Sequence, residues 1–218
     1  LSHASHVSIL RPATWLPWML LLVERLLRLE QLRKWHVVAL AACVAMQFSA
    51  GHAQMFLLNM MVLVAYALYR CWAAGSRASG RGGLPLVVLG VVLGCALSLP
   101  QLLASYQLSS LSQRAGGLDP AFFTSYSFHP LLGVTWLSPF VLGNPYPEDS
   151  IELMAYSGLL PLLLASLAIR RHSDRQKWLW LTLAVLGYLL ALGRWNPVRI
   201  QFRRVPVLGL FLVPARYL

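Results

Sequence analysis

The sequence predicts an all-α protein, a polytopic bundle of about six transmembrane helices in a single domain. Charged residues make up 11% of the 218 positions and apolar residues 58%, with a mean hydropathy of +0.62. Soluble domains have about a quarter charged residues and just under half apolar ones. Long uncharged runs alternate with short clusters of Lys and Arg, which is the pattern of membrane spans and their loops.

Three spans are expected in the first third of the chain, at 8–24, 36–50 and 53–70. The second and third come from one run of 33 residues without a charged side chain, which is long for one span and short for two. Basic residues flank this run on both sides. A single span would place the two flanks on opposite sides of the membrane, whereas a hairpin places them on the same side. Because Gly51-His52-Ala53-Gln54 supplies turn residues in the middle, we favour two short helices that turn at Gly51.

The remaining spans are expected at 84–104, 151–169 and 178–193, the first of which has 21 residues without a charge. A loop of about 46 residues, 105–150, separates the first from the second. It is rich in aromatic residues and contains an apolar stretch interrupted by Pro139, so we expect it to carry an interfacial or re-entrant helix. An Arg-rich segment, 194–218, follows the last span.

The basic residues determine the expected orientation. Loops 24–36, 70–83 and 170–177 hold eleven of the eighteen: Arg25, Arg28, Arg33, Lys34, Arg70, Arg77, Arg81, Arg170, Arg171, Arg175 and Lys177. The positive-inside rule makes these loops cytoplasmic. The outer side then receives the Gly51 turn, the loop 105–150 and the segment 194–218.

Five arginines lie in this outer segment, where basic residues are normally sparse: Arg194, Arg199, Arg203, Arg204 and Arg216. Guanidinium groups bind phosphate through two parallel hydrogen bonds, so such a cluster suits a lipid phosphate or pyrophosphate. The alternative is that they only anchor the helix ends at phospholipid head groups. Arg216 lies inside an apolar stretch, where an unpaired charge is costly and usually functional.

His52 and Gln54 at the outer turn, and Glu152 in the outer sequence Pro-Glu-Asp-Ser-Ile-Glu, are further candidate substrate-binding residues. A hydroxyl acceptor needs a carboxylate or a histidine as general base. The alternatives are interhelical hydrogen bonds for the first two residues and a helix-capping role for the acidic group. The catalytic residue itself is unknown.

The sequence indicates no cofactor and no metal site. His3 and His6 have the spacing of two ligands, but no third ligand is placed. Cys43, Cys71 and Cys95 lie in or beside apolar runs and are interpreted as small apolar residues. A net charge of +11 is compatible with nucleic-acid binding, but no Gly-rich phosphate loop or RNA-binding motif is present, so we expect no nucleic-acid partner.

Several stretches together resemble the bacterial membrane proteins of the YfhO family. They are the stretch from Trp15 to Arg25, the Gly51-His52-Ala53-Gln54 turn, Leu99-Pro100-Gln101, the stretch from Glu152 to Ala165, and the C-terminal Leu192-Gly193, Val205-Pro206 and Phe211 to Tyr217. The resemblance covers nearly the whole chain in the same order. The turn at Gly51 and the stretch around Arg216 are the most specific matches.

The resemblance implies a multi-pass GT-C-type glycosyltransferase of the bacterial cytoplasmic membrane. Such enzymes take a sugar from a polyprenyl-phosphate donor on the outer face, and this family is associated with glycosylating cell-surface polymers. A divalent metal could assist phosphate departure. The catalytic carboxylate usually lies in the first outer loop, near the N-terminus, so we expect this chain to be a fragment that holds donor-binding parts. Two other classes stay open: a transporter or flippase for lipid-linked sugars, and a non-catalytic membrane subunit.

Overall fold

A computed structural model describes residues 7–28, 33–74, 78–110, 127–141, 143, 156–171 and 174–196. Within these ranges the regular structure is helical and contains no strand, which confirms the predicted all-α class. The chain divides into two compact units, called here the N-terminal unit (His6–Ala115) and the C-terminal unit (Gly116–Leu218 with Leu1–Ser5). From sequence we treated the chain as one transmembrane domain; each unit is described by itself.

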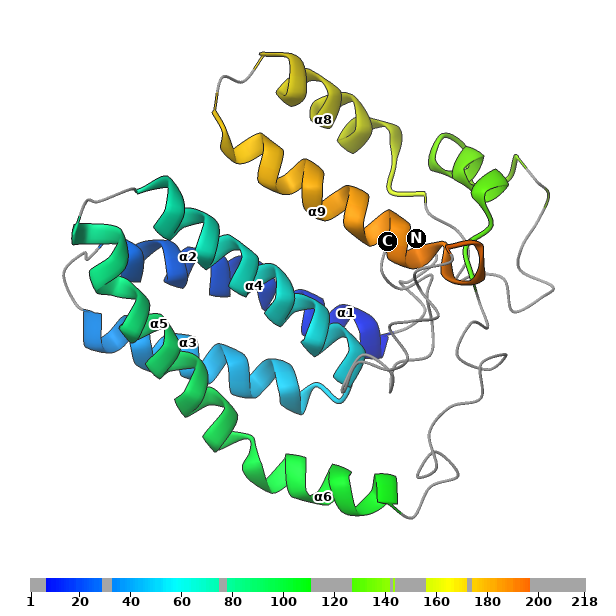
Figure 1. Ribbon diagram of the computed structural model, residues 1–218. Coiled ribbons are helices and arrows are strands. Elements are labelled where there is room, and N and C mark those ends of the chain that lie inside the picture. Colours follow the sequence, from blue (N-terminus) through cyan, green and yellow to red (C-terminus); the bar gives the residue numbers. More distant parts are fainter. Residues whose placement is uncertain are drawn as a thin grey trace. The chain divides into compact units, whose positions relative to one another are not determined.

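The N-terminal unit is a bundle in which α2, α3, α4 and α5 run in alternating directions, while α1 leads into α2 and α5 continues into α6 (Figure 1). Helix α2 lies against α3, α4 and α5, and α3 packs mainly on α5 rather than on its neighbour in sequence, α4. The six helices are α1 (Val7–Ala13), α2 (Leu16–Leu27), α3 (Arg33–Ser49), α4 (Ala53–Ala73), α5 (Ala78–Leu97) and α6 (Leu99–Ser110).

The alternating directions give this unit two distinct ends. One end, called the basic end, holds the last turns of α2 and α4 and the first turns of α3 and α5 (Figure 1). The opposite end, called the Gly51 end, holds the turn between α3 and α4. The expected cytoplasmic loops 24–36 and 70–83 therefore meet at a single end of the bundle, which agrees with a hairpin at Gly51 rather than one long span.

Two expected spans are broken at prolines. The region 8–24 divides into α1 and α2 at Thr14–Trp15, because Pro17 has no N–H to donate to the carbonyl of Ala13. The helix within the expected span 84–104 is not continuous: α5 ends at Leu97 and the chain bends by 56° before α6. Pro100 cannot donate to Ala96, and the Ser98 hydroxyl donates to the carbonyl of Gly94 at 2.9 Å, which stabilises the bend.

Helices α3 and α5 approach closely through two glycines one turn apart, Gly90 and Gly94. A Cβ atom at Gly94 would lie 2.6 Å from the Cβ of Val44 and 2.8 Å from the carbonyl oxygen of Ala41. At Gly90 it would lie 2.9 Å from a methyl carbon of Leu40. Small residues spaced four apart allow this kind of contact between membrane helices. The same contacts place Ser98 level with the last turn of α3, so both helix breaks lie at the Gly51 end.

The C-terminal unit contains a 3₁₀ helix, η2 (Pro130–Trp136), the hairpin of α8 (Leu159–Arg171) and α9 (Gln176–Ala191), and a short turn, η4 (Gly193–Trp195). The η2 helix is the helical element described within the expected outer loop 105–150, and α6 extends into the start of that loop. Helix α8 begins at Leu159, later than the expected 151, because Gly158 adopts a φ of +100° that ends the preceding extended segment. Residues 151–155 lie outside the described part.

A small core ties η2 to the end of α9. Phe128 is fully buried, its N–H donates to the carbonyl of Ala191 at 2.9 Å, and its ring meets the Tyr188 ring edge-on. His129 caps η2 by accepting the N–H of Leu131 at 3.1 Å. Its ring packs edge-on against Trp195, with the ring centres 4.4 Å apart.

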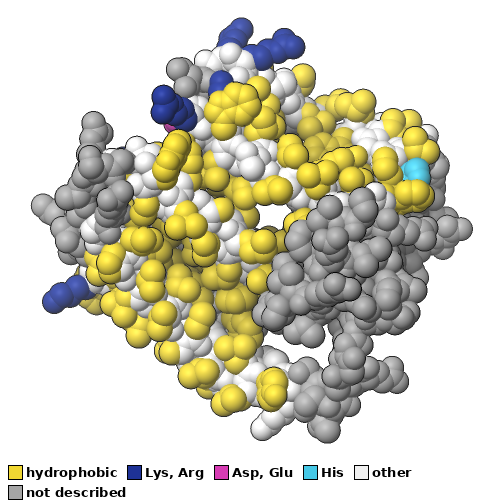
Figure 2. Space-filling view, viewed as in Figure 1, with side chains coloured by type: hydrophobic (Ala, Val, Ile, Leu, Met, Phe, Trp, Pro, Cys, Tyr) yellow, Lys and Arg dark blue, Asp and Glu magenta, His cyan; other side chains and the backbone are white. Residues whose placement is uncertain are grey.

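The described surface is largely apolar, whereas several buried side chains are polar. Large apolar side chains are exposed along α3, α4, α5, α6, α8 and α9, and α8 buries no residue. Gln47, Gln54, Asn59, Ser98 and Thr135 are buried. On the face drawn in Figure 2, hydrophobic side chains cover most of the described surface, and Lys and Arg lie towards its margin. Among the described residues, α4 is long and apolar enough to cross a bilayer alone, and the bent pair α5–α6 would do so together.

Candidate functional site

The turn at the Gly51 end is built by two residues that the sequence singled out. Gly51 has a φ of +83°, a conformation that glycine adopts without strain, and its N–H donates to the carbonyl of Phe48 at 3.1 Å. His52 is the N-cap of α4, and its Nδ1 accepts the N–H of Met55 at 3.2 Å. The histidine therefore has a structural role at the helix start, and its side chain is half-buried.

Three buried amide side chains, called here the amide cluster, lie near this turn: Gln47 of α3 and Gln54 and Asn59 of α4. Gln47 Nε2 and Asn59 Nδ2 both donate to the carbonyl oxygen of Pro12, at 3.2 and 3.0 Å. This carbonyl belongs to the last turn of α1, where the helix is interrupted and loses regular acceptor pairing. The two amides therefore satisfy a backbone group at a broken helix.

Gln47 has additional hydrogen-bonding capacity. Its side chain is fully buried, and its Oε1 has no hydrogen-bond partner within the described part of the chain. An amide can donate and accept at once, so a cluster of this kind is suited to binding sugar hydroxyls or other neutral polar groups. Of the carboxylates that the structure describes, Glu24 lies at the basic end and Asp174 in the C-terminal unit. The described residues at the Gly51 end thus offer amide groups and the imidazole of His52, but no carboxylate.

The basic end holds a charged cluster, called here the Glu24 cluster, which joins α2 to α4. Glu24 Oε1 accepts from Arg28 Nε at 2.7 Å and from Arg70 Nη2 at 2.5 Å, while Oε2 accepts the Tyr66 hydroxyl at 2.9 Å. The Glu24 side chain is 17% exposed and that of Arg70 29%, whereas that of Arg28 is 61% exposed. The carboxylate is satisfied on both oxygens, which makes this cluster a connection between helices.

The Glu24 cluster was not among the residues predicted for a site. In the sequence Glu24 is the carboxylate of the apolar helix α2, and an ionisable residue at such a position usually has a partner. That signal marks the residue as important but does not identify Arg70, which lies 46 positions away. Only the packing of α2 on α4 brings the two together.

The predicted phosphate-binding arginines fall at the edge of the described structure or beyond it. Arg194 lies in η4, between Gly193 and Trp195, and only its backbone is described. This turn follows α9 directly, and Asn196 Nδ2 donates to the carbonyl of Leu189 at 2.9 Å. Glu152, Arg203, Arg204 and Arg216 lie outside the described residues, so their proximity to His52 and Gln54 stays a prediction.

No group of three or more His, Cys, Asp or Glu side chains that could hold a metal ion occurs within the described ranges. Cys43, Cys71 and Cys95 are free thiols of intermediate exposure. Comparison of the whole chain with protein-family models, with curated proteins and with solved structures found no match.

Proposed function

We propose that the chain is an integral protein of the bacterial cytoplasmic membrane with about six spans. The observation that carries this proposal is the inverted distribution of polarity: amides are buried at the Gly51 end while leucines, valines and tryptophans are exposed along the helices. In water such a surface would favour association, whereas in lipid it is the favourable arrangement. Helices α3, α8 and α9 have 17, 13 and 16 residues, so on this proposal the flanking residues complete their spans.

In this proposal the basic end faces the cytoplasm and the Gly51 end faces outward. Arg28, Lys34 and Arg70 lie at the basic end, and Trp35 and Trp72 are exposed beside them. Indole side chains next to cations are typical of the interface between a bilayer and water. The amide cluster then lies at the outer end of the bundle, on the side that a lipid-linked sugar donor would occupy.

The proposed activity is that of a GT-C-type glycosyltransferase, which moves a sugar from a polyprenyl-phosphate donor to a cell-surface polymer or lipid. The resemblance to YfhO proteins supports the activity, and the buried amides at the Gly51 end supply groups suited to hydroxyls. Arg194, Arg203, Arg204 and Arg216 would neutralise the donor phosphate as the glycosidic bond breaks, so that the phosphate leaves more readily. Gln54, His52 and Glu152 would orient the sugar or the acceptor.

A second candidate is a flippase or transporter for the same lipid-linked sugars, and one observation favours it. Transport proteins commonly build their sites from discontinuous helices. The N-terminal unit has two, broken at Thr14–Trp15 and at Ser98, and buried amides meet the carbonyl of Pro12 beside the first break. Both breaks lie in one unit, however, rather than at corresponding positions of two related halves.

Membrane insertion is tested by washing membranes that contain the full-length protein with alkaline carbonate. An integral protein stays with the lipid, and release into the supernatant would contradict the first proposal. Cysteine labelling from outside intact cells, in a background without Cys43, Cys71 and Cys95, tests the orientation. We expect label at Arg199→Cys and none at Arg175→Cys; the opposite pattern would reverse the topology.

The activity is tested by adding a radiolabelled polyprenyl-phosphate sugar to such membranes. Transfer of label to an acceptor supports the glycosyltransferase, and movement of intact labelled lipid across the bilayer supports the flippase. If neither is observed, the non-catalytic subunit is supported. For Arg216→Ala we expect loss of sugar transfer with normal carbonate resistance. Wild-type transfer by this variant would remove the proposed role of Arg216.

A further inference from the structure

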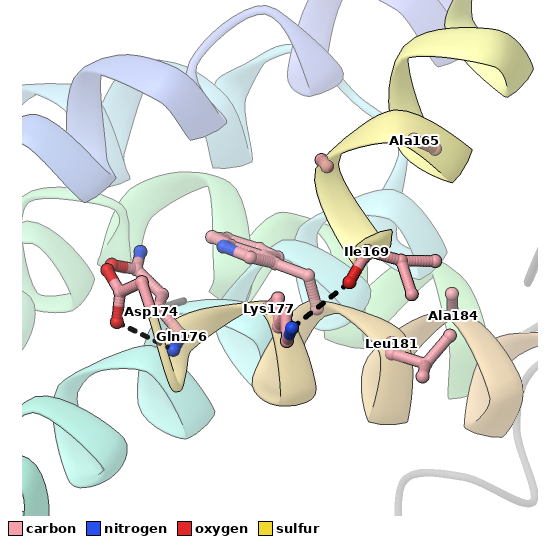
Figure 3. A pocket seen from close by; sticks show the side chains of 9 residues that line it. Ala165, Ile169, Asp174, Gln176, Lys177, Leu181 and Ala184 are labelled. Atoms are coloured by element: carbon pink, nitrogen blue, oxygen red, sulfur yellow. Dashed lines mark hydrogen bonds between the residues drawn. The ribbon is translucent and has the colours of Figure 1, made fainter. Parts of the chain in front are cut away.

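The hairpin of α8 and α9 encloses a cavity that the proposed sugar transfer does not use. The cavity has a volume of about 490 Å³ and is formed within the C-terminal unit (Figure 3). Its walls between the helices are apolar, with Ala165, Ala168 and Ile169 from α8 and Trp180, Leu181 and Ala184 from α9, and Asp174, Gln176 and Lys177 line its loop end. Pockets of 300–1,000 Å³ with apolar walls are typical of small-molecule and lipid sites.

Four basic residues lie at the two helix ends that the connecting loop joins, and one of them, Lys177, lines the cavity. Arg170 and Arg171 end α8, and Arg175 and Lys177 begin α9. Asp174 is the carboxylate in this group, and its Oδ1 accepts the N–H of Gln176 at 3.0 Å, so these side chains carry four positive charges and one negative charge, or +3. Lys177 lines the cavity, where its Nζ donates to the carbonyl of Ile169 at 3.0 Å (Figure 3).

The exposure of α8 defines what kind of molecule fits. Most of its large apolar side chains are exposed and none is buried, although the helix forms one wall of the cavity. The walls therefore require an apolar occupant. The cationic rim at one end requires an anion, and a molecule that combines the two in one chain is an anionic phospholipid.

We propose that the α8–α9 cavity binds one anionic phospholipid, with an acyl chain between the helices and the phosphate at the rim formed by Arg170, Arg171, Arg175 and Lys177. The site rests on the proposed membrane insertion but not on sugar transfer. On the proposed topology it belongs to the cytoplasmic leaflet, because loop 170–177 is one of the three basic loops. It is therefore distinct from a donor site on the outer face.

The test measures lipid binding to the purified full-length protein by native mass spectrometry, with phosphatidylglycerol and with phosphatidylcholine of identical acyl chains. We expect one phosphatidylglycerol molecule to bind more tightly than phosphatidylcholine. Each juxtamembrane cation contributes roughly fivefold to anionic-lipid binding. The double variant Arg175→Gln, Lys177→Gln should therefore weaken phosphatidylglycerol binding by roughly 25-fold, and Arg25→Gln, at the basic end of the N-terminal unit, should not.

Filling the cavity tests the position of the acyl chain. Ala184→Trp should abolish the tightly bound phosphatidylglycerol, whereas Val185→Trp, on the exposed surface of the same helix and outside the cavity, should retain it. Circular dichroism checks that Ala184→Trp keeps its helical content. If it does not fold, Ala165→Trp, which fills the cavity from α8, is used in its place.

Equal binding of the two lipids, or wild-type binding by both cavity-filling variants, would overturn the proposal. A change from dimer to monomer in Ala184→Trp would also overturn it, because a second copy would then occupy the cavity. Carbonate washing is scored separately, so failure of membrane insertion is distinguished from failure of the lipid site.

Discussion

Replacing Glu24 by Gln should destabilise the N-terminal unit through the loss of its contact with Arg70. The carboxylate and the guanidinium are 2.5 Å apart and both are largely buried. Two unit charges about 4 Å apart interact by roughly 4 kcal/mol at an effective dielectric constant of about 20. Removing one partner of a buried pair costs about 3–5 kcal/mol. Because Arg70 retains some contact with solvent, we expect Glu24→Gln to lower the free energy of unfolding by roughly 2–4 kcal/mol.

Arg28 provides a matched control, because it contacts the same oxygen of Glu24 at 2.7 Å but is far more exposed. Exposed ion pairs contribute about 0–1 kcal/mol, so Arg28→Gln should cost at most about 1 kcal/mol. The double variant Glu24→Leu, Arg70→Leu removes both charges and leaves neither partner alone. It should be more stable than either single variant, since an apolar replacement of a buried pair is often neutral.

The assay is denaturant unfolding in detergent micelles, followed by helical circular dichroism. From most to least stable, the expected order is wild type, Arg28→Gln, the double variant, and then Glu24→Gln and Arg70→Gln. The reasoning is refuted if Arg28→Gln is as destabilising as Arg70→Gln, or if the double variant loses the sum of the two single losses.

Three further changes test other contacts by the same unfolding assay. Gly94→Val should cost about 1–3 kcal/mol by forcing α3 and α5 apart, while Val92→Leu on the exposed side of α5 should change stability little; equal effects would contradict the close contact. Asn59→Ala should cost about 1–2 kcal/mol by removing a buried hydrogen bond to Pro12, and wild-type stability would argue against that bond. His52→Ala should cost about 1 kcal/mol and His52→Asn should restore it, because both His and Asn can cap α4; failure of Asn to restore stability would indicate a role other than capping.

The helical class and the Gly51 hairpin could be predicted because both depend on local sequence composition. A long uncharged run with basic residues at both flanks and Gly51 in its centre fits two helices better than one. Ala53, where α4 begins, follows His52 directly, and His52 can act as a cap. Such signals depend on neighbouring residues and need no knowledge of packing.

The helix breaks were missed although their prolines were visible. Counting apolar residues treats Pro17 and Pro100 as ordinary members of a span, since membrane helices often tolerate proline. Whether a proline bends the chain depends on how the freed carbonyl is satisfied. The carbonyl of Pro12, beside the Ala13 carbonyl that Pro17 leaves without a donor, accepts from the nearby Trp15 N–H and also from Gln47 and Asn59. The two amides lie more than thirty positions away, and no local pattern reveals them.

The candidate site was predicted only in part for the same reason. Gln54 and His52 lie next to a turn that the sequence identifies, and Gln54, like Gln47 and Asn59, is buried in the chain's own packing. Glu24 and Arg70 illustrate the opposite case, since each looks like an isolated charge until α2 and α4 are side by side. The phosphate-binding role of Arg203, Arg204 and Arg216 stays a prediction from orientation and resemblance.

The packing of α3 on α5 has a consequence for biogenesis. When α3 leaves the ribosome, the glycine face that receives Leu40 and Val44 has not yet been synthesised. Helix α4 is synthesised before α5, and α4 contacts α3 only weakly. A nascent chain halted after residue 74 would therefore hold α3 against α2 without its main neighbour, and the α3 surface at Leu40 and Val44 would stay uncovered until Gly90 and Gly94 have been synthesised.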